Sequence, residues 1–98
     1  MSGDAVSIAP DVYSVVLEND RVRVLEVRMA PGGSSAMHSH PDCVVVSIKG
    51  SNNRFSGPGV DPIEMEIPDA SAIFMEGMDH AVENIGDGEA HAFIIELK

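Results

Sequence analysis

Short apolar runs alternate with clusters of turn-forming residues along the whole chain, and no stretch repeats its apolar positions at the spacing of an amphipathic helix. The runs are rich in valine, isoleucine and other residues that favour strands, and they recur at intervals typical of antiparallel sheets. The pattern predicts about nine strands. They cover residues 13–17, 22–29, 37–40, 43–48, 54–56, 63–67, 72–74, 81–84 and 92–97.

Glycine, proline, asparagine and aspartate gather between these runs, as tight or left-handed turns require. The predicted turns are residues 18–20, 30–33, 50–53, 57–59, 68–69 and 86–88. About nine short strands in one small domain predict a closed or nearly closed double sheet, because closure removes unpaired sheet edges. Inward side chains from distant strands would then surround a common cavity. We therefore expect an all-β barrel or sandwich.

The length of 98 residues predicts one domain, residues 1–98, with a single compact core. A hydrophobic content of 44% favours a folded globule over a disordered chain. No apolar stretch approaches the roughly 18 residues of a membrane span, and residues 1–6 lack the basic and apolar regions of a secretory signal. Cys43 is the sole cysteine, which excludes an internal disulfide and fits a reducing compartment. We expect a cytoplasmic protein.

The charge balance excludes two classes of partner. Sixteen acidic residues against six basic ones give a formal net charge of -10. This charge repels nucleic acid and anionic membranes at long range, so we expect neither as a partner. The excess of acidic residues is interpreted as a well-solvated surface.

Three of the four histidines fall in two short motifs whose spacing suits one mononuclear metal site. In a strand, every second side chain lies on the same face, so His38 and His40 would project together while Ser39 points away. His80 follows about forty residues later, after a glycine turn at Gly77. Long-range closure of the sheet would bring this third imidazole to the other two.

The two motifs resemble those of the cupin superfamily. The first has a glycine, a His-x-His pair and a second glycine, and the second has the spacing Gly-x-x-His-x-x-x-Asn. Together they cover about half of the chain, and the segments 18–24 and 38–42 further resemble a group of small single-domain cupins. The matching residues are Gly32, His38, His40 and Gly50 in the first motif and Gly77, His80 and Asn84 in the second. We expect Asn84 to hold a turn through backbone hydrogen bonds.

The resemblance implies a single jelly-roll β-barrel, the double-stranded β-helix, that binds one divalent metal through two histidines, a glutamate and a third histidine. This chain departs from the family at the glutamate, where Val44 stands between Cys43 and Val45. Asp69 and Met75 also replace the glycine and proline that usually open the second motif. We therefore expect His38, His40 and His80 to bind the metal without a carboxylate.

Three neutral imidazoles leave a divalent site with a charge of +2, which lowers the pKa of bound water or favours an anionic substrate. Similar three-histidine sites occur in cupin relatives such as cysteine dioxygenase and acetylacetone dioxygenase, both of which use iron(II). Imidazole ligands suit several metals, so iron, nickel, zinc, manganese, cobalt and copper are not distinguished.

Further residues near the motifs are candidates for the site or its pocket. Cys43 would approach the metal as a thiolate, but strict alternation from His40 turns it to the opposite face, which favours a core position. Arg54 would anchor a substrate carboxylate or pair with surface acids. Glu76 and Asp79 flank the third histidine and are candidate acceptors that orient its imidazole. Methionines beside the histidines suit copper(I), or flexible packing at the pocket mouth. These are Met37, Met75 and Met78.

Two function classes follow. The first is a small metalloenzyme acting on a compact molecule: a dioxygenase if iron is bound, an isomerase or lyase if the metal is redox-silent. No motif in the sequence identifies the general base of such an enzyme. The candidates are Tyr13, Asp42, Glu76 and Glu96. The alternative is a non-catalytic barrel, with or without metal, that binds or senses a small ligand. The apolar runs 44–46 and 93–95 are hydrophobic on both strand faces, which predicts a homodimer or, as the alternative, an outer face covered by the segment 8–16.

Overall fold

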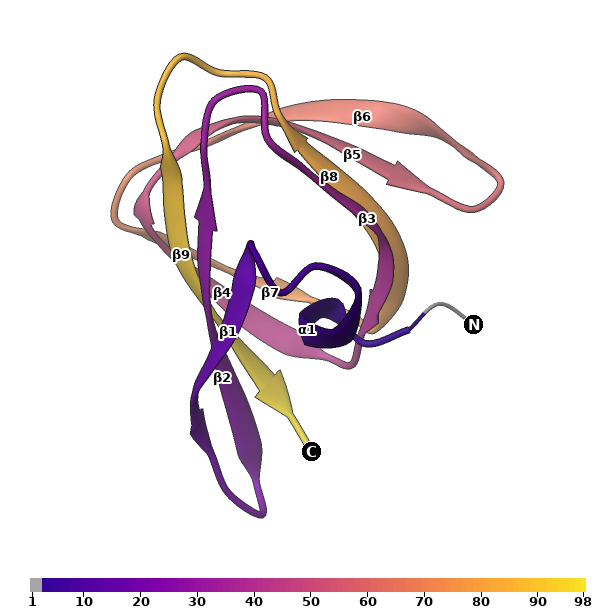
Figure 1. Ribbon diagram of the computed structural model, residues 1–98, viewed down its shortest axis with the longest axis vertical. Coiled ribbons are helices and arrows are strands. Elements are labelled where there is room, and N and C mark those ends of the chain that lie inside the picture. Colours follow the sequence, from indigo (N-terminus) through magenta and orange to yellow (C-terminus); the bar gives the residue numbers. More distant parts are fainter. Residues whose placement is uncertain (1–2) are drawn as a thin grey trace.

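A computed structural model describes residues 3–98, and a short helix precedes a chain of strands (Figure 1). Within these residues no helix has the length and apolar character needed to cross a bilayer. The segment 1–6 was interpreted as lacking a secretory signal, and its residues 1 and 2 lie outside the part of the chain that the structure describes. The elements are α1 (Ala5–Ile8), β1 (Tyr13–Glu18), β2 (Val22–Met29), β3 (Ser34–His40), β4 (Cys43–Lys49), β5 (Ser51–Gly57), β6 (Val60–Ile67), β7 (Ser71–Met75), β8 (Met78–Asn84) and β9 (Ala90–Leu97).

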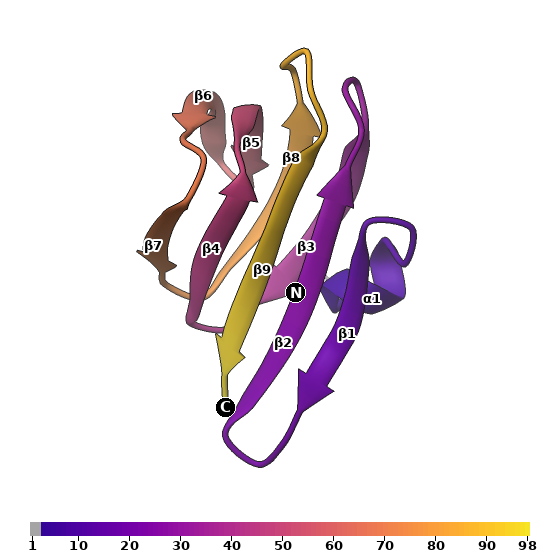
Figure 2. The same cartoon turned by 90° about the vertical axis from the view of Figure 1, so that its left-hand side faces the viewer.

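The strands form two sheets, and each paired strand runs antiparallel to its neighbour. The first sheet has the order β1-β2-β9-β4-β7 and the second has the order β3-β8-β5-β6. Figures 1 and 2 show the two sheets facing each other, with α1 beside β1 and β3. The C-terminal strand β9 lies in the middle of the first sheet, between β2 and β4. This is the jelly-roll double sheet that the resemblance implies.

Each run predicted to be a strand forms one, and the predicted and observed strands differ in where they begin and end. The predicted turn over residues 50–53 is wrong, because β5 begins at Ser51 and only Gly50 separates it from β4. A Cβ on Gly50 would overlap the carbonyl group of Ile67, so glycine permits this close passage. The helix α1 was missed. It is a single turn capped by Asp4, whose carboxylate accepts a hydrogen bond from the Val6 amide, and one turn is too short to show a helical period.

The interior between the sheets is unusually polar. Its apolar core cluster consists of Ala5, Tyr13, Leu25, Cys43 and Ile94. Beside seven buried apolar residues, eight polar or ionisable residues are buried among those described. Each such group needs a partner to offset the loss of water, so this interior is organised for more than packing. The buried polar residues are Ser35, His38, His40, Ser47, Asn53, His80, Asn84 and Glu96.

Asn84, which ends the second motif, is fully buried and holds the turn after β8. Its amide nitrogen donates to the carbonyl oxygens of Met29 and Gly88, at 3.0 and 2.9 Å. Its amide oxygen accepts from the Ser51 hydroxyl and the Gly86 backbone N–H. The expectation that Asn84 secures a turn through backbone hydrogen bonds is confirmed.

Candidate metal centre

The structure brings the three motif histidines together inside the double sheet. His38 and His40 lie on β3 and project to the same face, and His80 on β8 lies directly opposite His38 in the antiparallel register. All three side chains are buried. One ring nitrogen from each lies within 4.8 Å of the others, and the ring centroids are 4.7–5.1 Å apart. The strand pairing therefore delivers the cluster that the motif spacing predicts.

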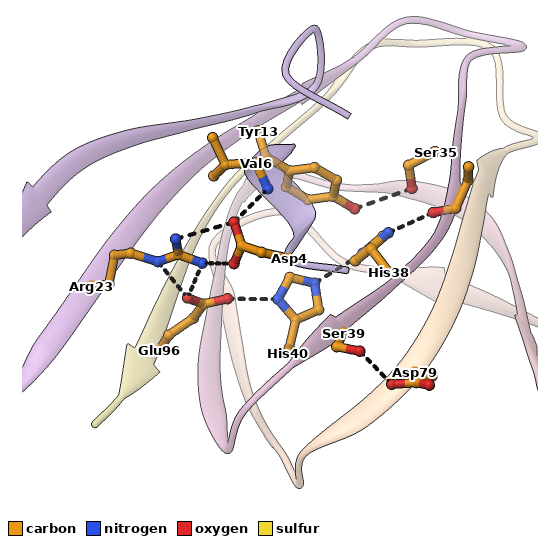
Figure 3. Close-up of polar contacts among 11 residues, drawn as sticks. Asp4, Val6, Tyr13, Arg23, Ser35, His38, Ser39, His40, Asp79 and Glu96 are labelled. Atoms are coloured by element: carbon orange, nitrogen blue, oxygen red, sulfur yellow. Dashed lines mark hydrogen bonds and ion pairs between the residues drawn. The ribbon is translucent and has the colours of Figure 1, made fainter. Parts of the chain in front are cut away.

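Hydrogen bonds at the outer nitrogens orient two of the imidazoles. His38 Nδ1 donates to the Ala36 carbonyl oxygen at 2.7 Å, and His40 Nδ1 donates to Glu96 Oε2 at 2.8 Å (Figure 3). Each imidazole then carries its lone pair on Nε2. The two Nε2 atoms face each other at 3.0 Å. Two lone pairs at this distance repel unless a cation lies between them.

His80 carries the clearest sign of a missing partner. Within residues 3–98 neither of its ring nitrogens has a hydrogen-bond partner, although both are buried. Burial, together with the neighbouring His40 and His38, lowers the pKa of His80 to about 3. Burial is also the main reason that the pKa of His38 is lowered. The neutral forms that result are the forms that bind a metal ion.

The donor set fits a divalent transition metal. Two nitrogen atoms bound at about 2.1 Å to one ion, at a right angle, are about 3 Å apart. The separation of the His38 and His40 Nε2 atoms matches this value. Imidazole nitrogens are ligands for zinc, iron, nickel and copper alike, so the set does not select among these metals.

Glu96 anchors the cluster from the neighbouring sheet. It is 2% exposed, and its carboxylate holds both His40 and the Arg23 guanidinium, which also pairs with Asp4 (Figure 3). The hydrogen bond to Asp4 and the contacts with Glu96 raise the pKa of Arg23, and Arg23 lowers the pKa of Asp4. A carboxylate behind a histidine ligand fixes the ring and makes its other nitrogen a stronger donor.

Tyr13 forms one wall of the site. Its ring packs edge-on against His38, with centroids 4.9 Å apart, and its hydroxyl lies 3.2 Å from the Ser35 hydroxyl. Burial raises the pKa of Tyr13 to about 12. The phenol is therefore neutral near pH 7 and is a poor general base.

The structure differs from expectation at the start of β4, where the family motif has a glutamate and this chain has Val44. Cys43 is buried in the apolar core, as the core interpretation holds, and burial raises the pKa of its thiol to about 11. The prediction that Cys43 faces away from the metal, made by counting strand alternation from His40, was wrong. The turn at residues 41–42 separates β3 from β4, so the alternation of inward and outward side chains starts anew in β4. Cys43 and Val45 face inward, and Val44 lies between them on the outer face. Cys43 lies directly opposite Glu96.

The remaining candidates are spread around the site. Asp79 accepts from the Ser39 hydroxyl, and Glu76 is exposed. Neither orients His80, whose ring nitrogens have no partner within residues 3–98. Arg54 pairs with Glu64 and Glu83 on the surface, which is the alternative considered for it.

Two cavities open beside the histidines. An inner cavity of about 90 Å³ lies between the sheets, and a wider outer cavity of about 610 Å³ lies beside β5 and β6. Met75 lines both cavities and Met78 lines the outer one, so they pack at the pocket mouth. The two cavities share Phe55, Ile73, Met75 and His80.

The interior positions of two polar residues, Glu96 and Asn53, were not predicted from the sequence. Glu96 was considered only as a base, although a carboxylate in the otherwise apolar run 92–97 signals a buried partner. Asn53 was assigned to a turn, and the sequence around it has no signal that distinguishes it from Asn52.

No protein-family model matches the sequence, and no protein of curated function is similar to it. Solved structures do match the fold. A cupin domain from Bordetella pertussis Tohama I is 28% identical, covers 100% of this chain and 97% of its own, and has a TM-score of 0.81. An RmlC-like cupin family protein with a double-stranded β-helix fold, from Methanocaldococcus jannaschii, is 11% identical, with a TM-score of 0.69 over 88% of this chain and 78% of its own.

A protein with a double-stranded β-helix domain from Klebsiella pneumoniae is also similar. It is 20% identical, covers 88% of this chain and 75% of its own, and has a TM-score of 0.68. The fold and the two motifs agree in pointing to the same family.

Proposed function

We propose that this chain, a small domain of the cupin superfamily, binds one divalent metal ion through His38, His40 and His80 and acts as an enzyme on a small molecule. The observation that carries the proposal is the buried imidazole of His80, whose two nitrogens have no partner within residues 3–98. Leaving a buried polar group unpaired costs about 1–3 kcal/mol, and a metal ion offsets that cost.

The chain's own groups prepare the site. Ala36 and Glu96 hold the Nδ1 protons of His38 and His40, so that both Nε2 atoms keep their lone pairs turned inward. The Tyr13 ring excludes water from one side, and Phe55 stacks on His80 with centroids 5.9 Å apart. When bound, the metal supplies Lewis-acid polarisation, or oxygen chemistry if it is iron. The proposed reaction is dioxygenase-like with iron and isomerase- or lyase-like with a redox-silent metal.

A non-catalytic binding or sensing domain is the second candidate. It is favoured by the lining of the inner cavity, which includes no carboxylate among residues 3–98. Glu96, a buried acid beside the cluster, is engaged by both His40 and Arg23.

The partners proposed are a small molecule and a second copy of the chain. The net charge of -10 opposes binding to nucleic acid or anionic membranes. The reduced, buried Cys43 fits a cytoplasmic protein.

Metal analysis of protein prepared without a histidine tag tests the proposal. We expect about one divalent ion per chain, and loss of most of it in His80→Ala. His91→Ala is the matched control, because His91 pairs with Glu26 outside the cluster. Full metal occupancy in His80→Ala would reject the three-histidine site. Oxygen uptake by the iron-loaded protein, absent with zinc, would favour oxygenation over Lewis-acid chemistry.

A further inference from the structure

Asn53 is a buried polar residue that the metal centre does not use. It lies on β5, is 9% exposed, and its Oδ1 is buried without a hydrogen-bond partner within residues 3–98. Ser51, Asn53 and Phe55 share the inward parity of β5 and line the inner cavity. Arg54 has the outward parity and pairs with surface acids. The unpaired amide oxygen is therefore directed into the space between the sheets.

The inner cavity is mainly aliphatic, so one free acceptor stands out in it. Val27, Val45, Val82 and Ile94 are among the apolar residues that line it. Ser51 donates to Asn84 and Ser71 donates to the Pro68 carbonyl oxygen, while Ser47 and Lys49 add further polar groups to the lining. Asn53 thus offers an unpaired hydrogen-bond acceptor in a wall that is mostly apolar.

The same cavity reaches the metal centre. His80 and Tyr13 line it together with Asn53. Asn53 pairs with Asn84, four residues along β8 from His80, so the amide and the His80 imidazole lie at different levels of one cavity. A molecule held by Asn53 is thereby oriented with its other end toward His80.

Size limits the molecule. An engineered apolar cavity of about 150 Å³ holds benzene. The inner cavity of about 90 Å³ is smaller and admits a ligand of about four or five heavy atoms, unless it extends into the outer cavity past Phe55 and Met75.

We propose that Asn53 is a specificity-determining residue, whose Oδ1 accepts a hydrogen bond from the hydroxyl or N–H group of a small, neutral and otherwise apolar molecule. As a statement about substrate, this rests on the proposed function. In the orientation of the amide seen here, a carboxylate or ketone oxygen that meets Oδ1 is repelled, because acceptor would face acceptor.

Two probes with the same number and connectivity of heavy atoms test this. 2-Butanol offers a hydroxyl donor where 2-butanone offers only an acceptor. NMR chemical-shift titration of the full chain should show that 2-butanol binds about 3- to 10-fold more tightly. In Asn53→Leu the ratio of the two affinities should fall to about one, with 2-butanone still binding. Asn52→Leu is the matched control, since Asn52 is exposed and on the outward parity, and it should keep the wild-type ratio.

Equal binding of the two probes to the wild type, no binding of either, or an unchanged preference in Asn53→Leu would overturn the assignment. If Asn53→Leu does not fold, Asn53→Ala gives the same comparison. Metal content is measured on the same samples and should be equal in wild type and Asn53→Leu. An alcohol preference in protein that binds no metal would reject the proposed function while supporting the role of Asn53.

Discussion

His40 on β3 and Glu96 on β9 share a hydrogen bond of 2.8 Å between Nδ1 and Oε2, although 56 residues separate them in the chain. Both side chains are almost fully buried, at 2% and 3% exposure. Arg23 neutralises the carboxylate from its other side, at 2.7 Å. This pair joins the two sheets at the metal centre and sets which nitrogen of His40 faces inward.

The first prediction concerns the charge on Glu96. Glu96→Gln keeps a hydrogen-bond acceptor for His40 but removes the negative charge, which weakens the donor strength of Nε2. We expect metal affinity to fall about 10- to 100-fold, as measured by competition with a chelator. Glu89→Gln removes an exposed carboxylate that pairs with Arg28 and serves as the control. Unchanged affinity in Glu96→Gln would contradict an orienting role.

The second prediction separates stability from function at His80. Replacing an unpaired buried imidazole with an apolar side chain of similar size removes a desolvation cost. His80→Leu should therefore abolish metal binding and stabilise the metal-free protein by about 1 kcal/mol in urea unfolding. His91→Leu breaks the hydrogen bond to Glu26 and should not show this gain. A clear loss of stability in metal-free His80→Leu would show that the imidazole has a partner that supports the fold.

The third prediction concerns pH. The pKa of His80 is about 3 in the folded protein and 6.5 in an unperturbed imidazole, mainly because of burial. Below pH 6.5 the unfolded chain binds a proton that the folded chain does not, so stability falls as the pH drops from 6.5 toward 3. The slope is about 1.4 kcal/mol per pH unit for each such imidazole. Urea unfolding of metal-free protein between pH 4 and 7 measures it, and the slope should be smaller in His80→Leu.

The fourth prediction concerns the position of the absent glutamate. From the motif alone, Val44→Glu would add a carboxylate ligand. Because Val44 lies on the outer face, we expect the metal affinity of Val44→Glu to equal that of the wild type within about two-fold. Tighter metal binding, measured by chelator competition, would mean that β4 presents Val44 to the interior.

The fifth prediction concerns assembly. Phe74 is 58% exposed and lies opposite the outward-facing Val44 in the β4–β7 register, so this part of the first sheet presents apolar surface. We expect a dimer by light scattering at micromolar concentration, and a monomer for Phe74→Glu, because a charge would be buried in the contact. Val60→Glu, at an exposed site on β6, is the control. A monomer mass for the wild type would reject the dimer.

The sequence by itself determined the elements and the identity of the three histidines. Strand alternation and turn residues act over a few neighbours, so the runs that became β1 to β9 could be recognised locally. The parity of His38 and His40 is equally local, and the spacing of the second motif added His80. The role of Asn84, at the end of the second motif, in holding a turn could likewise be predicted from the sequence.

Tertiary structure decided which side chains surround those histidines. Glu96 reaches His40 only because β9 lies between β2 and β4, and strand order is set by closure of the whole sheet rather than by neighbours in the chain. Cys43 faces inward because the turn at residues 41–42 resets the parity. Asn53 faces the cavity because Gly50 lets β5 start early, and its unpaired oxygen exists only in the packed interior. No local signal shows which distant strands pair, so the partners of these side chains required the fold.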